Sequence, residues 1–144
     1  MKFEKFLKGV GTHGEVINVR GSQKWLVCNG VGMLIPKGVD NLLGVVKNSD
    51  YSDIIHELID YTPDDILELK KAVLLVPTGN SKDILRVFES QFGNEIGILN
   101  ENYGLLEKED ILSYDVIITV EKDLKMMLVF NFENELIGYI TGTI

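Results

Sequence analysis

Cys28, His13 and His56 are the only side chains of this 144-residue sequence that offer thiol or imidazole chemistry. A Cys/His pair acts as nucleophile and base only when the two groups are within hydrogen-bond reach and a third group orients the base. Cys28 stands in an apolar run with Trp25 and Val27, where a thiol is ordinarily buried and inert. His13 falls in a glycine-rich loop that suits a surface contact. We therefore expect no catalytic residue and no metal ligand among these three.

Closely spaced carboxylates are the second candidate for chemistry. Two carboxylates do acid–base work when their environments separate their pKa values, usually in an apolar cleft. The pairs of this chain stand in expected turns and helix starts, which predicts that they are solvated. These acids are Asp64 and Asp65, Glu107 with Glu109 and Asp110, and Glu133 with Glu135. An acidic surface that mimics DNA is a weaker alternative, because such proteins ordinarily carry longer acidic runs.

Gly9, Gly11 and Gly14 have the GxGxxG spacing of a dinucleotide-binding turn. That turn follows a hydrophobic strand and opens a helix, whereas this one follows a charged stretch and opens a β-branched segment. The run from Gly79 to Lys82 also lacks the GK[ST] order of a phosphate-binding loop. The glycines therefore predict a loop, and we expect a chain without a cofactor that is not an enzyme.

The composition is that of one ordinary globular domain spanning residues 1–144. The sequence is 45% apolar and 25% charged, and a chain of this length buries roughly 68–70% of its unfolded surface without disulfides or metals. A single cysteine excludes an intramolecular disulfide. The charged start and the lack of an apolar run of about 18 residues predict neither a signal peptide nor a membrane span, hence no membrane partner.

Charge and glycine are distributed unevenly along the chain. The net charge of −8 disfavours direct contact with nucleic acid. Residues 1–50 carry seven cations and four acids, whereas residues 51–144 carry seven cations and eighteen acids. The two blocks attract each other either within one folded chain or between subunits. A glycine-rich N-terminal segment (residues 1–46) and a flexible junction at 47–52 are the only subdivisions that we expect.

Apolar periodicity and turn residues predict strands at 15–19, 24–28 and 31–35 after a short helical turn or irregular arm at 2–8. Turns are expected at Gly21-Ser22 and Asn29-Gly30. A helix is predicted at 52–60, with Ser52 as its cap, and a second short helix from Thr62.

The remaining elements complete the expected fold. The further expectations are a buried strand at 71–76, helix or strand at 84–88, a strand at 95–99, one turn at 100–106, a strand at 116–120 and a hairpin of 125–130 with 136–140. The sum is an α+β fold with a mostly antiparallel β-sheet, barrel- or sandwich-like, and one or two covering helices.

Three blocks of sequence carry a family resemblance, at residues 6–14, 24–36 and 103–108. Together they resemble small proteins encoded among the head and packaging genes of tailed phages and prophages of low-GC Gram-positive bacteria. The resemblance implies a structural or assembly protein without catalytic residues. It also implies a location in the cytoplasm of the bacterial host during assembly, or in the virion.

Protein partners are therefore expected, either other copies of the chain or other virion proteins. The charge distribution predicts head-to-tail association, with Lys2, Lys5, Lys8 and Lys24 facing Glu107, Glu109 and Asp110 of a second copy. Apolar contacts from the glycine-rich loops would supply most of the affinity. The candidate contact residues are Lys5, Lys8, Val10, His13, Val31, Met33, Glu107 and Glu109. A small acidic regulatory or inhibitory protein that sequesters a host partner is the alternative.

Overall fold

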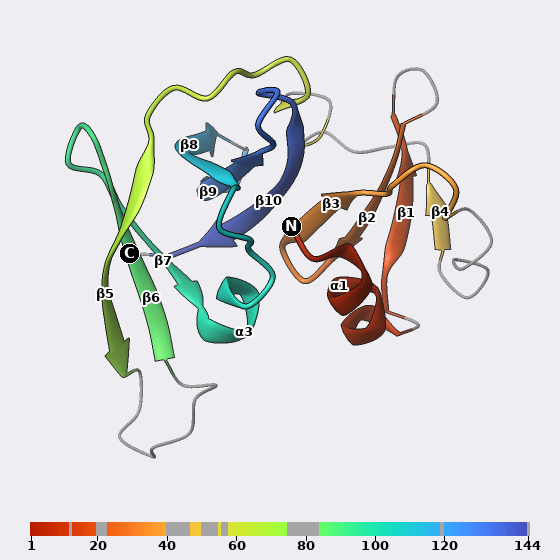
Figure 1. The fold of residues 1–144 in the computed structure, drawn as a ribbon, viewed down its shortest axis with the longest axis horizontal. Helices are drawn as coiled ribbons and strands as arrows, with labels where there is room; N and C mark the ends of the chain where they lie inside the picture. Colours follow the sequence, from red (N-terminus) through yellow and green to blue (C-terminus); the bar gives the residue numbers. More distant parts are fainter. Residues whose placement is uncertain are drawn as a thin grey trace.

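The computed structural model describes residues 1–11, 13–19, 23–39, 47–49, 55, 58–74, 84–118 and 120–143. Within these residues the chain forms two β-sheets, with helices that include α1 (Phe3–Val10) and α3 (Asn100–Tyr103). The sheets are almost entirely antiparallel and are packed as in a sandwich, without closing into a barrel (Figure 1). The predicted α+β class is thus confirmed.

The larger sheet has seven strands in the order β4-β1-β2-β3-β10-β9-β8. Their bounds are β1 Glu15–Asn18, β2 Lys24–Cys28, β3 Val31–Leu34, β4 Lys47–Ser49, β8 Ile111–Ile118, β9 Asp123–Phe130 and β10 Leu136–Gly142. Strand β4 pairs in parallel with β1, and the other pairs are antiparallel. Because β10 lies between β3 and β9, the last strand joins the N-terminal hairpins to the C-terminal ones.

Turn residues explain the N-terminal hairpins. Asn29 and Gly30 both have positive φ, 49° and 78°, as the tight two-residue turn between β2 and β3 requires. The predicted pairing of β1 with β2 is confirmed, with Val16 opposite Leu26. The expected turn at Gly21-Ser22 lies outside the described residues.

The smaller sheet consists of β5 (Leu67–Leu74), β6 (Ile84–Ser90) and β7 (Glu95–Leu99). Residues 84–88, which the sequence left open, are therefore strand. Gly97 of β7 and Thr143, which follows β10, exchange two backbone hydrogen bonds of 2.9 Å. This contact connects the smaller sheet to the end of β10 (Figure 1).

Several predicted elements are corrected. The short helix expected from Thr62 is wrong, because residues 61–64 have no regular structure and Ile66 bridges to Ser113. The strand expected at 71–76 begins at Leu67, and its residues 71–73 are exposed because β5 is an edge strand. The N-terminal helix also runs further than predicted, through Gly9 to Val10.

Some of the helix predicted at 52–60 is described. Ile55 and Leu58 are helical and fully buried, and the Ile59 N–H donates to the Ile55 carbonyl at 3.0 Å. The expected cap Ser52 and His56 lie outside the described residues. Of the expected flexible junction 47–52, residues 47–49 form strand β4, and residues 50–52 lie outside the described ranges.

The larger sheet is buried on both faces. Leu26 and Met127 belong to one apolar cluster, which α1 and the smaller sheet cover. The neighbouring residues Trp25 and Met126 belong to another cluster, which includes Ile55. Because side chains alternate between the faces of a strand, β2 and β9 contribute to both cores.

Candidate functional site

A cleft of about 330 Å³ lies between α1, α3 and the turn that connects β2 to β3. It is called the cleft below, and it is lined by Lys5, Phe6, Gly9, Val10, Cys28, Asn29, Val31, Leu99, Glu101, Asn102 and Leu105. Phe6, Val10 and Val31 are buried and give it an apolar floor. Lys5 and Glu101 are exposed at its rim. A cleft of this size and lining can accept an apolar side chain between two charges of opposite sign.

Helix α1 forms one wall because its apolar residues recur at helical spacing. Phe3, Phe6 and Val10 lie on one stripe and are all buried. The Lys2 N–H donates to the Leu105 carbonyl at 2.8 Å, and Lys5 Nζ donates to the Gly104 carbonyl at 3.2 Å. These bonds hold α1 against the segment that follows α3.

Helix α3 forms the opposite wall and is fixed to β6. The Tyr103 ring packs against Phe88 with 6.1 Å between ring centroids, and the Arg86 guanidinium lies 4.7 Å from the centroid of the same ring. Arg86 Nε also donates to Asn100 Oδ1 at 2.8 Å. The stacked cation and the short hydrogen bond make this wall well ordered despite the brevity of α3.

The cleft brings together only some of the predicted contact residues. Lys5, Val10 and Val31 line it. Val10, Val31 and Met33 are at most 2% exposed, so each offers almost no surface of its own to a partner. They face the core because α1 and the smaller sheet cover this face of the larger sheet. Lys8, His13, Glu107 and Glu109 are exposed but lie outside the cleft lining.

Asp110 forms an ion pair with the amino group at the start of the same chain. Its Oδ1 accepts a hydrogen bond from the Met1 amino group at 3.0 Å, and the two side chains are only 5% and 3% exposed. Asp110 Oδ2 accepts from the Glu107 N–H at 2.9 Å. Asp110 is therefore not available to a second copy, which corrects its place in the predicted head-to-tail contact.

Two further expectations about single residues are corrected. Cys28 is a free thiol that is half-buried in the wall of the cleft, not fully buried. Asp65 is buried rather than solvated, and its Oδ2 accepts from Asn94 Nδ2 at 3.2 Å. Among the residues that the structure describes, no group of three or more His, Cys, Asp or Glu side chains is arranged to hold a metal ion.

An exposed apolar row crosses the smaller sheet and reaches the cleft. Val73 lies opposite Leu85, and Leu85 lies opposite Leu99, so the three side chains share one face of the sheet. Val73 and Leu99 are 39% and 40% exposed, and Leu85 between them is buried. These three residues are called the apolar row. Sequence reasoning missed it because the register of β5, β6 and β7 defines it.

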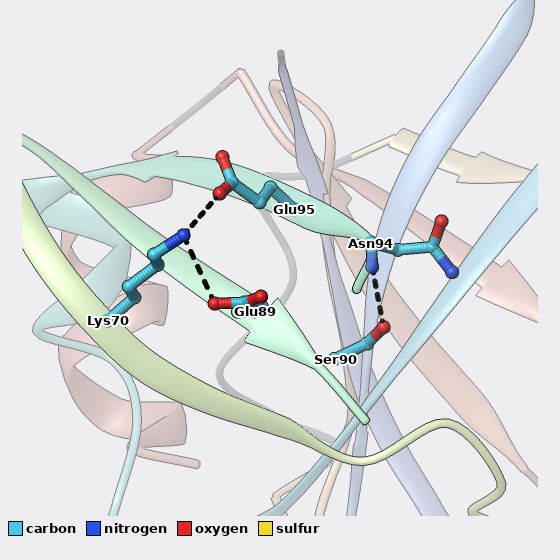
Figure 2. A network of polar contacts seen from close by, with 5 residues as sticks. All are labelled: Lys70, Glu89, Ser90, Asn94 and Glu95. Carbon is cyan, nitrogen blue, oxygen red and sulfur yellow. Dashed lines mark hydrogen bonds and ion pairs between the residues drawn. The ribbon is translucent and has the colours of Figure 1, made fainter. Parts of the chain in front are cut away.

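The other end of the same face is charged. Figure 2 shows Lys70 Nζ between the carboxylates of Glu89 and Glu95, at 3.1 and 2.6 Å. The hydrogen bond from Lys70 holds the pKa of Glu95 below its ordinary value. A β-bulge at Lys70 separates Leu69 from Lys71. Lysines and a bulge on an edge strand oppose the addition of a further strand, so the edge of β5 is a poor docking site.

A second cavity, of about 310 Å³, is acidic. Its lining residues are Asp60, Tyr61, Thr62, Asp64, Ser113, Tyr114, Asp115 and Leu128. Burial raises the pKa of Tyr114, and the charges of Asp115 and Asp65 raise it further. The Asp64 N–H donates to Ser113 Oγ at 3.2 Å and fixes one wall. This cavity would favour a cationic group.

Comparison of the chain with protein-family models, with curated proteins and with solved structures gave no match. None of the helices in the described ranges is long and apolar enough to cross a membrane. The geometry of the site is therefore the basis for the functional proposal.

Proposed function

We propose that this protein is a structural or assembly protein of phage or prophage origin that works through protein–protein contacts. The cleft and the apolar row form its contact surface. The observation that carries the proposal is that Leu99 belongs to both, so the exposed end of the apolar row also lines the cleft. The resemblance of residues 6–14, 24–36 and 103–108 supports the phage class.

The chemistry of the surface supports a protein partner. Apolar patches with charged borders are typical of protein interaction sites, in which apolar contacts supply affinity and rim charges supply orientation. The apolar row is bordered on its sheet by Lys71, and the cleft by Lys5 and Glu101. Both walls of the cleft are held by hydrogen bonds, so the ordering cost of binding is small.

Sedimentation of the chain over a range of concentrations tests the proposal. We expect association beyond one chain of 16.2 kDa, and we expect Leu99→Lys to weaken it. Leu69→Lys is the matched control, because Leu69 is similarly exposed, at 45%, but lies outside the cleft and the apolar row. Equal effects of the two substitutions would argue against this surface.

The acidic cavity favours a second candidate function, a regulatory or inhibitory protein that sequesters a basic host partner. Asp60, Asp64 and Asp115 gather there with Tyr61 and Tyr114. Carboxylates and tyrosine rings together suit a lysine or arginine side chain. A strictly monomeric chain would favour this function over assembly.

A further inference from the structure

The tip between β9 and β10 presents an aromatic side chain to solvent on an ordered turn. Phe132 is 78% exposed. Asn131 Oδ1 accepts from the N–H groups of Glu133 and Glu135 at 2.9 and 3.0 Å. The Asn131 N–H donates to the Glu135 carbonyl at 3.0 Å, and Asn134 adopts a positive φ of 62°. Residues 131–135, called the Phe132 turn below, are thus held in one conformation before any contact forms.

Two carboxylates follow Phe132 in this turn. Glu133 and Glu135 are exposed and so close together that a hydrogen bond and the charge of Glu135 raise the pKa of Glu133. Two like charges held together favour a cationic neighbour. The Phe132 turn therefore offers one phenyl ring with a negative border.

The cleft offers the complement of this turn. Its floor is apolar, and its volume of about 330 Å³ accommodates a phenyl ring. Lys5 lies at its rim, and Lys8 lies three residues further along α1, where side chains are neighbours. Both lysines are exposed. Glu101 on the α3 side would repel the carboxylates of an incoming segment, so these would face the lysines of α1.

The Phe132 turn and the cleft lie apart in the fold. In Figure 1 the start of β10, which follows the turn, is near the top of the view, and the helices α1 and α3 are well below it. The Phe132 turn therefore cannot enter the cleft of its own chain. It can enter the cleft of a second copy, whose own turn can enter the cleft of a third.

We propose that Phe132 of one copy inserts into the cleft of a second copy, with Glu133 and Glu135 facing Lys5 and Lys8. This inference rests on the proposed function and names its partner, a second copy of the chain. The contact joins two different surfaces, so its repetition gives a ring or a filament. The phenyl ring supplies the apolar contact, and the charges set its orientation and the rate of encounter.

Substitution of two similarly exposed phenylalanines distinguishes this specific contact from non-specific apolar association. Phe132→Asp is expected to weaken self-association by about tenfold or more, as truncation of a central aromatic does. Phe92→Asp is the matched control, because Phe92 is 76% exposed at the turn after β6. Sedimentation measures both variants, and thermal unfolding confirms that each is folded. Equal weakening by both substitutions would overturn the inference.

Charge exchange tests the orientation of the contact. Lys5→Glu with Lys8→Glu should weaken association, and Glu133→Lys with Glu135→Lys in the same chain should restore it. Lys24→Glu with Lys37→Glu makes the same charge change at exposed positions away from the cleft and should have little effect. Failure of the second exchange to restore association would contradict the predicted pairing.

The outcomes also separate this inference from the proposed function. If Leu99→Lys weakens association and Phe132→Asp does not, the cleft holds another segment, and only the inference fails. If the unaltered chain is monomeric at every concentration, both fail.

Discussion

Gly32 of β3 lies directly beneath the ring of Tyr139 of β10. The two residues are paired across the strands, and a Cβ added to Gly32 would lie 2.7 Å from the ring carbon Cζ of Tyr139. The same ring stacks on Trp25 with 6.4 Å between centroids. This glycine therefore lets an aromatic side chain cover the junction between the N-terminal strands and β10.

Gly32→Ala is expected to destabilise the protein by about 1–3 kcal/mol, because the new methyl group displaces the Tyr139 ring from its packing. Urea unfolding measures the change. Gly9→Ala is the opposite control, since no atom lies within 4 Å of its added Cβ, and alanine at a helix position is favoured by up to about 1 kcal/mol. Equal effects of the two substitutions would contradict the packing described.

Stability should fall at alkaline pH through Tyr139. Burial raises its pKa to about 12, whereas an unfolded tyrosine loses its proton near pH ~10. Between these values the folded state keeps a proton that the unfolded state has lost, so the unfolding free energy decreases as pH rises. Below pH ~10 this contribution is fully present. Tyr139→Phe should lose this component of the pH dependence, and an unchanged slope would contradict it.

Deletion of residues 136–144 should abolish cooperative folding. It removes Leu136, Tyr139 and Ile140 from the core and the strand between β3 and β9. Each buried large apolar side chain contributes about 1.5–3 kcal/mol, and the net stability of a domain is only about 5–15 kcal/mol. Circular dichroism during heating checks this expectation. A cooperative transition near that of the full chain would show that β10 is dispensable.

The partly buried ion pair of Asp110 should be sensitive to substitution. Asp110→Asn leaves the Met1 amino group without its carboxylate, and loss of a partly buried charged hydrogen bond costs about 1–3 kcal/mol. Asp123→Asn changes an exposed carboxylate and should alter stability by less than about 0.5 kcal/mol. Urea unfolding of both variants gives the comparison, and similar midpoints would contradict the role of Asp110.

Local sequence signals predicted the hairpins well because turn residues and alternation act within a few residues. The turn residues Asn29-Gly30 and the short loop Glu133-Asn134-Glu135 are examples. The structure contains both predicted hairpins, β2 with β3 and β9 with β10. The helix predicted from Thr62 is absent because Ile66 forms a β-bridge with Ser113, which requires an extended backbone in that segment.

The candidate site was harder to predict, since it depends on contacts between distant segments. Val10 and Val31 were predicted as surface contacts, but the covering elements bury them. The role of Leu99 follows from its register opposite Leu85 and from the position of α1, and neither is visible in its local sequence.

Mixing two complementary variants tests the head-to-tail contact most directly. Phe132→Asp keeps the cleft intact, and Leu99→Lys keeps the Phe132 turn intact. Each variant alone should sediment as one chain, and an equimolar mixture should form a complex of two chains and nothing larger, because only one productive contact is possible. A mixture that stays monomeric while the unaltered chain associates would contradict the account.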